Sequence, residues 1–270
     1  MGAIADLLEI YRAQFKVTIA LQLQYRAQLA IWLLFTFIEP VVLLVVWSTV
    51  ANSSGGQVGG YTAETFAAYY IAMMMVNHLT FTWLMFEFEF RIRQGQFSPK
   101  LLRPVHPIHA DIADNLSYKL LTLVVMIPVT IVLTVLFHPA LHPPPWAVAG
   151  FAVALVLAFL LRFLLEWTLA LAAFWTTRVA AVNDAYLLSA FFFSGQIAPL
   201  ALFPGAVRGL AALLPFRWTI AFPVELLLGR VAWPDMLWGF GAQIGWALFA
   251  FALLSVVWRH GLQRYTAVGA

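Results

Sequence analysis

The sequence contains no cysteine and very little charge. With no cysteine in 270 residues, disulfide bonds, thiol catalysis and thiolate metal sites are all excluded. Charged residues make up 10% of the chain and hydrophobic residues 63%, whereas soluble domains average roughly 25% and 45–50%. A chain of this composition is not an ordinary soluble domain, and we expect it to lie in a membrane.

The chain also lacks a phosphate-binding loop. No run of the form GxxxxGK followed by Ser or Thr occurs, so the chain is not itself an ATP-driven motor. Its net charge is +3, and the basic residues are spread over short connections rather than gathered on one soluble face. This distribution argues against nucleic acid as a partner and predicts that the basic residues set the membrane topology.

Six apolar runs are long enough to cross roughly 30 Å of hydrocarbon as helices. They cover Leu29 to Val50, Phe66 to Phe86, Leu120 to Phe137, Ala147 to Phe174, Tyr186 to Phe203 and Leu237 to Trp258. Their continuity does not fit the alternating pattern of an outer-membrane barrel. The sequence therefore predicts an all-α membrane protein, with a six-helix bundle over residues 29–258 as its single domain.

The two ends of the chain differ from the bundle. Apolar residues recur at helical spacing in residues 1–28, with acidic and basic residues between them, which predicts an amphipathic helix at the membrane interface. Acidic residues precede the first long apolar run, so we expect no cleavable signal peptide. Residues 259–270 are expected to form a tail.

Lys and Arg predict the orientation. The side of the membrane that is richer in Lys and Arg carries Arg12, Lys16, Arg26, Arg91, Arg93, Lys100, Arg103, Lys119, Arg178, Arg259 and Arg264. The other side carries Arg208, Arg217 and Arg230. The loops Ala51 to Tyr61 and His138 to Trp146 have neither residue type. Because the basic side is the cytoplasmic one, both termini are expected in the cytoplasm, with the spans in a bacterial-type inner (plasma) membrane.

One connection is too long for a hairpin and too apolar for a free loop. It runs from Pro204 to Asp235 and is also interrupted by Pro215, Pro223 and Pro234. One interpretation is a segment that folds back into the membrane and packs against the bundle near its outer mouth. The other is a pair of flat interfacial helices anchored by Trp218 and Trp233. The sequence leaves both open.

Three segments carry a family resemblance. They read RQGQFSPKLLRP after the second span, and SGQIAPLALFPG and LPFRWTIAFPVELLLG near the fifth. Together with six spans and an N-terminal interfacial helix, the chain resembles the permease subunits of ABC-2 type exporters over almost its whole length. The most specific part is an ordered series: Ser194, Gly195, Pro199, Phe203, Pro204, Pro215, Phe216, Pro223 and Gly229.

The resemblance implies partners. In such exporters two permease subunits, as a homodimer or as a heterodimer with a similar chain, assemble with two cytoplasmic ABC ATPase subunits that bind ATP and Mg. The segment between spans two and three forms a coupling helix that fits a groove in the ATPase. The chain itself would then catalyse no reaction and hold no cofactor or metal, with membrane lipid around it.

The basic segment after span two has the features of such a coupling helix. Gly95 and Pro104 bound a short helix, and Phe97, Leu101 and Leu102 offer an apolar face. The full set of expected coupling residues is Arg93, Gly95, Phe97, Ser98, Lys100, Leu101, Leu102 and Arg103. The alternative is an ordinary positive-inside loop on anionic lipid. Just before it, the spacing of Glu87 and Glu89 to Arg91 and Arg93 predicts ion pairs.

A few polar residues fall at bilayer depth, where insertion costs roughly 2.5–3.5 kcal/mol per charged side chain. They are Glu39, Asn77, His78, Arg162 and Glu166. The four-residue spacing of Arg162 and Glu166 favours a pair that neutralises itself. Arg162 is also a candidate partner for Glu39. These residues either line a translocation route or brace the subunit, and the sequence does not separate the two.

An outer gate is predicted where span five meets the proline-rich connection. Gly195 and Pro199 are expected to break the helix and form a hinge. The candidate gate residues are Ser194, Gly195, Pro199, Pro204, Pro215 and Pro223. Phe191, Phe192 and Phe193 precede them and would either shape an apolar pathway or face lipid.

Two other functions compete with an ABC exporter. A proton-coupled secondary transporter would use Glu39, His78 and Glu166 as a relay. A membrane-embedded enzyme acting on lipid head groups would need a cluster of polar residues, and one is available: His106, His109, Asp111 and Asp114. The histidine pairs 106/109 and 138/142 lie among prolines and lack the carboxylates of a complete metal site, so no metal is predicted.

Overall fold

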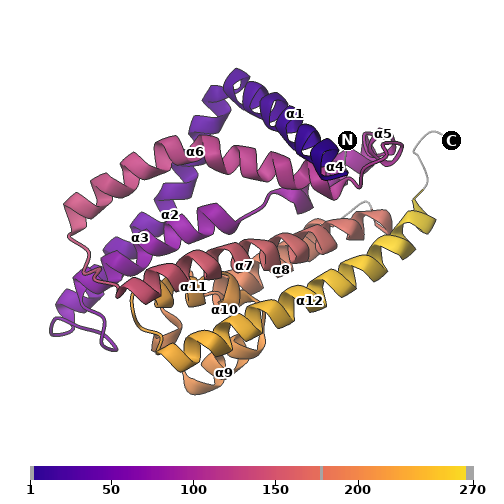
Figure 1. The fold of residues 1–270 in the computed structure, drawn as a ribbon. Coiled ribbons are helices and arrows are strands. Elements are labelled where there is room, and N and C mark those ends of the chain that lie inside the picture. The colour runs from indigo at the N-terminus through magenta and orange to yellow at the C-terminus, as the bar shows by residue number, and fades with distance from the viewer. Residues whose placement is uncertain (1–2, 177–178, 266–270) are drawn as a thin grey trace.

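The computed structural model describes residues 3–176 and 179–265, and nearly all of these are helical (Figure 1). In these ranges the only β pairing is an isolated bridge between Val58 and Tyr61. The predicted all-α class is confirmed. The expected basic residue Arg178 and the last five residues of the predicted tail fall outside the described ranges.

Five segments are long and apolar enough to cross a membrane. They are α2 (Arg26–Ser53), the pair α3 (Ala63–Thr80) and α4 (Leu84–Arg93), α6 (Ile108–Phe137), α7 (Pro145–Ala170) with the 3-10 turn η1 (Leu171–Phe174), and α12 (Trp233–Arg264). Each contains the corresponding predicted span, or nearly all of it. Helix α12 continues six residues past Trp258, so residues 259–264 are helical rather than part of a tail.

The predicted fifth span is not one continuous helix. Helix α8 (Ala180–Phe193) has 14 residues, which at 1.5 Å per residue is about 21 Å and short of the hydrocarbon thickness. Gly195 then takes a φ of 88°, a left-handed conformation that ends the helix at little cost only for glycine. The break expected at Gly195 is therefore present, but a helix from Tyr186 to Phe203 is wrong.

Small residues let α7 and α12 pack closely. Ala147, Gly150, Ala154 and Ala158 recur along one face of α7 and, apart from the Cβ-less glycine, their side chains are fully buried. A Cβ added at Gly150 on α7 would lie 2.8 Å from Met236 Sδ on α12. Helix contacts through small residues are typical of membrane bundles.

The proline-rich connection folds against this pair. It contains η2 (Leu200–Leu202), α9 (Gly205–Leu213), α10 (Phe216–Thr219) and α11 (Ala221–Leu227). Helix α11 packs on α7 and α3, and its residues from Ala221 to Leu226 are buried. Of the two expected tryptophan anchors, Trp218 is buried and Trp233 is 56% exposed. The packing of α11 agrees with the folded-back interpretation better than with two flat helices.

The chain ends and the basic segment share one end of the molecule. Figure 1 shows the N-terminus, α4, α5 (Ser98–Leu101) and the end of α12 at one end, with the α2–α3 and α6–α7 loops at the other. Helix α1 (Ala3–Gln24) lies across α6, where Tyr11 and Gln14 bond His109 and Asp114 at 3.2 and 2.8 Å. The N-terminal helix is thus held by polar contacts with the bundle.

Candidate functional site

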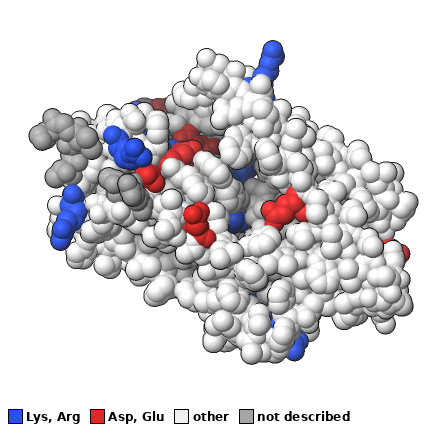
Figure 2. Space-filling view, turned by 180° about the vertical axis from the view of Figure 1, so that it is seen from behind, with Lys and Arg blue, Asp and Glu red and all other residues white. Residues whose placement is uncertain are grey.

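A cavity of about 1190 Å³ opens on one face of the bundle. Figure 2 shows this face hollowed, with acidic and basic side chains around the hollow. Its lining comes from α1, α2, α3, α4, α6, α7 and α8. Four of the five polar residues predicted at bilayer depth line it: Glu39, Asn77, His78 and Arg162.

The floor of the cavity is a break in the second span. Helix α3 ends at Thr80 and α4 begins at Leu84, with Phe81, Thr82 and Trp83 between them in non-helical conformation. Backbone groups freed by such a break cost several kcal/mol each in hydrocarbon unless protein groups bind them. This segment contains neither glycine nor proline, and the sequence did not predict the break.

Two charged side chains from neighbouring helices bind the freed backbone groups. Lys119 Nζ on α6 donates to the carbonyl oxygen of Phe81 at 2.7 Å. The backbone nitrogen of Thr82 donates to Glu166 Oε2 on α7 at 3.0 Å, and the Thr82 hydroxyl donates to the same oxygen. Lys119 and Glu166 are therefore buried because their side chains bind the backbone groups that the break leaves unpaired.

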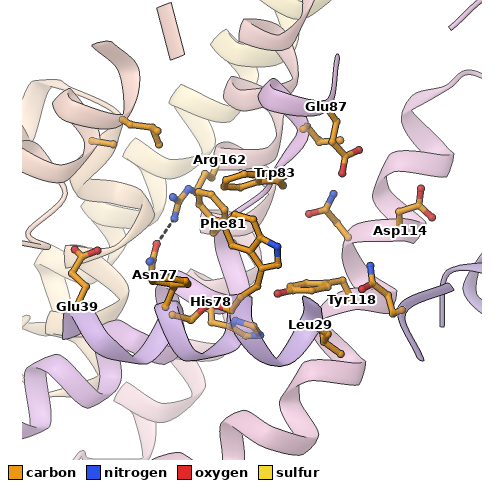
Figure 3. Close-up of a pocket in the computed structure, with 18 of the residues that line it drawn as sticks. Leu29, Glu39, Asn77, His78, Phe81, Trp83, Glu87, Asp114, Tyr118 and Arg162 are labelled. Atoms are coloured by element: carbon orange, nitrogen blue, oxygen red, sulfur yellow. Dashed lines mark hydrogen bonds between the residues drawn. The ribbon is translucent and has the colours of Figure 1, made fainter. Parts of the chain in front are cut away.

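Arg162 completes the network (Figure 3). Its Nε donates to Glu166 Oε1 at 2.8 Å, and its Nη1 donates to Asn77 Oδ1 at 2.8 Å and Thr80 Oγ1 at 3.2 Å. The predicted Arg162–Glu166 pair is confirmed, with both residues at most 4% exposed. In the described part of the chain Arg162 makes no ion pair with Glu39, because its donors are directed to α3 and to Glu166.

The remaining polar residues do not form a relay. His78 Nε2 lies 2.8 Å from Thr122 Oγ1 on α6, and Glu39 is exposed to the cavity on α2. Within the described residues no hydrogen bond or ion pair connects Glu39, His78 and Glu166. The geometry gives no support to a proton path through these three residues.

The predicted coupling segment is partly built into the core. Gly95 takes a φ of 66° and turns the chain from α4 into the four-residue helix α5. The side chain of Phe97 is fully buried, with its ring 5.3 Å from Phe88, 5.7 Å from Phe174 and 6.2 Å from Trp258 between centroids. The expectation that Phe97 presents an apolar face to a partner is wrong, because rings of its own chain cover it.

Other coupling residues divide between buried and exposed positions. Lys100 Nζ lies 3.4 Å from the buried carboxylate of Asp111, and the Ser98 hydroxyl lies 2.7 Å from that of Tyr265. Leu101 is partly buried against the core. Leu102 is 87% exposed, and Arg93 and Arg103 are exposed too.

Asp111 anchors this end of the molecule. Arg91 Nη1 donates to its Oδ1 at 2.7 Å and Trp167 Nε1 to its Oδ2 at 3.0 Å. The predicted pairs of Arg91 with Glu87 and of Arg93 with Glu89 are both present. Asp111 is fully buried, so it is a structural ion-pair residue with no open face for a substrate.

The two histidines of the predicted polar cluster pack against different aromatic residues. His109 contacts Tyr11, while the ring of His106 lies 4.6 Å from that of Trp258. Burial lowers the pKa of His106, and His109 lowers it further. Among the residues that the structure describes, no group of three His, Asp or Glu side chains is placed to hold a metal ion.

The predicted gate residues are mostly buried within the fold. Ser194 and Gly195 are buried, and the Tyr69 hydroxyl donates to the Gly195 carbonyl at 2.8 Å. Pro199, Pro215 and Pro223 are buried and Pro204 is exposed. None of these six residues lines the cavity, although the neighbouring Phe191 and Gln196 do.

Comparison with known proteins gave one family match. A family model described as ABC-2 family transporter protein matches residues 37–269. No curated protein matches the chain. The matched range contains every long helix from α3 onward, most of α2, the break in the second span and the segment around α5.

Proposed function

Because the chain belongs to the ABC-2 family of transporter proteins, we propose that it is the membrane-spanning permease subunit of an ATP-driven exporter. The observation that carries this proposal is the cavity of about 1190 Å³ among helices long enough to span a membrane. Its volume exceeds that of most single-ligand pockets, about 300–1,000 Å³. A cavity of this size, open on one face, suits a translocation pathway completed by a second subunit.

The energy would come from other chains. The sequence has no phosphate-binding loop, so ATP and Mg would be bound by two cytoplasmic ABC ATPase subunits. A second permease, either another copy of this chain or a similar one, would close the open side of the cavity. We place the complex in a bacterial-type inner membrane, with both termini and α5 on the cytoplasmic side. In that orientation α8 and the folded-back α9 to α11 together form the fifth crossing.

The exposed rim of the α5 segment is the proposed ATPase contact. Leu102 is 87% exposed beside the exposed Arg103, whereas Phe97 ties the segment to α4, η1 and α12 through its ring contacts. A push on Leu102 would therefore reach α4 through Phe97. Helix α4 meets the cavity floor at the break, so rigid movement of α4 would change the cavity.

Replacing Leu102 by Asp tests this contact. An acidic residue in place of an exposed apolar anchor should lower the affinity for the ATPase by about tenfold or more. The measurement is the amount of ATPase that co-purifies with the full-length chain from detergent extracts, together with the ATP hydrolysis of the complex. Leu141→Asp, in the loop at the opposite end, is the matched control.

The control variant should retain the ATPase, and both variants should keep the melting temperature of the unchanged chain. If Leu102→Asp and Leu141→Asp retain the ATPase equally, the proposed contact surface is wrong. If the unchanged chain binds no ATPase at all, the proposed class of transporter is wrong as well.

A further inference from the structure

Three carboxylates line the cavity and form no close ion pair among the described residues. They are Glu39 on α2, Asp114 on α6 and Asp184 on α8. Asp114 accepts hydrogen bonds from the neutral side chains of Gln14 and Thr18 and also interacts electrostatically with Arg91. Glu39 and Asp184 are exposed and make no hydrogen bond or ion pair within the described chain. Glu39 lies at bilayer depth, where a free carboxylate is costly unless water or a cation binds it.

The basic groups of the cavity are already neutralised. Arg91 pairs with Glu87 and Asp111, and Arg162 pairs with Glu166 at 2.8 Å while donating to Asn77 and Thr80. Arg162 is also 4% exposed, which leaves little of its charge for a ligand. The uncompensated charge in the cavity is therefore negative, and it selects against anions.

Aromatic rings form the wall between these carboxylates. Figure 3 shows Phe81 and Trp83 lying between Glu39 on one side and Asp114 on the other. Trp32 and Trp83 are 45% and 42% exposed, with their rings 5.1 Å apart. Faces of tryptophan attract organic cations electrostatically by about 0.5–2 kcal/mol, and their apolar area binds hydrophobic substituents.

From this combination of free carboxylates and exposed rings, we propose that the cavity binds an amphipathic organic cation. Its apolar body lies against Trp32 and Trp83, and Glu39 and Asp184 balance its charge. As the cargo of an exporter this ligand rests on the proposed function, but its binding requires neither the ATPase nor ATP. The two ideas can therefore fail separately.

Tetraphenylphosphonium is a suitable probe because it carries one positive charge inside four phenyl groups. Equilibrium dialysis would measure its binding to the purified full-length chain in nanodiscs of zwitterionic lipid, with empty nanodiscs as background. The double variant Glu39→Gln with Asp184→Asn should weaken binding about tenfold, since each substitution removes one attraction in a partly desolvated site. Tetraphenylborate, of the same shape and opposite charge, should bind the double variant at least as well as the unchanged chain.

A matched control separates the cavity from overall charge. Glu64→Gln with Asp235→Asn removes two exposed carboxylates outside the cavity and should leave tetraphenylphosphonium binding unchanged. The proposal is overturned if the two double variants weaken binding equally. It is also overturned if the chain binds no more of the cation than empty nanodiscs do. A second copy of the chain that fills the cavity would give this result. Either result would leave co-purification of an ATPase, and hence the proposed function, unaffected.

Discussion

Glu166 is the residue on which the cavity floor depends most. It neutralises Arg162 and also accepts the backbone hydrogen of Thr82 at the helix break. A buried ion pair seldom adds much net stability, but removal of one partner leaves an uncompensated buried charge. We therefore interpret this pair as a structural support that shapes the cavity.

Replacing Glu166 by Gln should strongly destabilise the protein. The substitution leaves Arg162 buried with no counter-charge, which costs about 3–5 kcal/mol. Thermal unfolding of the purified chain in detergent, followed by tryptophan fluorescence, measures the loss as a lower melting temperature. Glu89→Gln is the control, because its pair with Arg93 spans 3.4 Å and Arg93 is largely exposed, so a change of about 0.5 kcal/mol or less is expected. Equal melting temperatures for the two variants would contradict the role given to Glu166.

Pairing within one helix was predictable from the sequence, and pairing between helices was not. The four-residue spacing of Arg162 and Glu166 places both on one face, and they do form an ion pair. The second partner of Arg162 depends on how α3 packs against α7, and no local pattern encodes this. For that reason Asn77 was correctly included in the polar cluster, while the candidate pair of Arg162 with Glu39 does not form.

At the scale of elements, the interrupted second span is the main departure from expectation. The residues from Thr80 to Leu84 are all compatible with a helix, and the usual signals for a break are glycine and proline. The indirect signal was the presence of Arg162 and Glu166 in an apolar run, because buried charges need polar partners. The backbone of the break supplies part of what they bind.

The α5 segment shows a different limit of sequence patterns. Its apolar residues predicted a contact surface, but the pattern does not say whether that surface packs against the same chain or against a partner. Phe97 packs against its own chain, since Phe88, Phe174 and Trp258 surround its ring. For Leu102, which is 87% exposed, binding to a partner remains a prediction.

The turn that ends α8 offers a prediction of its own. Gly195 has a φ of 88°, and a Cβ there would lie 2.5 Å from the Tyr69 hydroxyl. Gly195→Ala should therefore cost about 1–3 kcal/mol from backbone strain alone. Gly209→Ala is the control, because Gly209 lies in α9 with nothing within 4 Å of the added Cβ, and alanine favours a helix by about 1 kcal/mol.

Chemical unfolding in detergent would compare the two alanine variants. The account expects a lower transition midpoint for Gly195→Ala and an unchanged or higher one for Gly209→Ala. A tolerated alanine at position 195 would show that the left-handed turn is not required where α8 ends.

At the scale of the whole molecule, the helical class and most spans follow from the length of the apolar runs. Five predicted spans coincide with segments suited to crossing a membrane. The fifth apolar run does not form a single helix, because the predicted span included Gly195, where α8 ends and the chain turns. Both termini and α5 lie at one end of the molecule in Figure 1, as the distribution of Lys and Arg among the loops predicted. That this end faces the cytoplasm stays a prediction.

The cavity is a property of the assembled helices alone. Its lining residues come from seven helices and no motif joins them. Four of its polar residues were predicted because charge and polarity at bilayer depth are costly. The aromatic wall was not, because Trp32, Phe81 and Trp83 read as ordinary lipid-facing or packing residues until the break places them around one space.

We propose that ATP hydrolysed by a partner drives transport through this cavity. The most direct test is uptake of tetraphenylphosphonium into inside-out vesicles that contain the chain and an ABC ATPase that co-purifies with it. The account predicts accumulation with ATP, none with a non-hydrolysable analogue, and a marked loss in the Glu39→Gln, Asp184→Asn variant. Accumulation driven by a pH gradient without ATP would contradict it and would favour a secondary transporter.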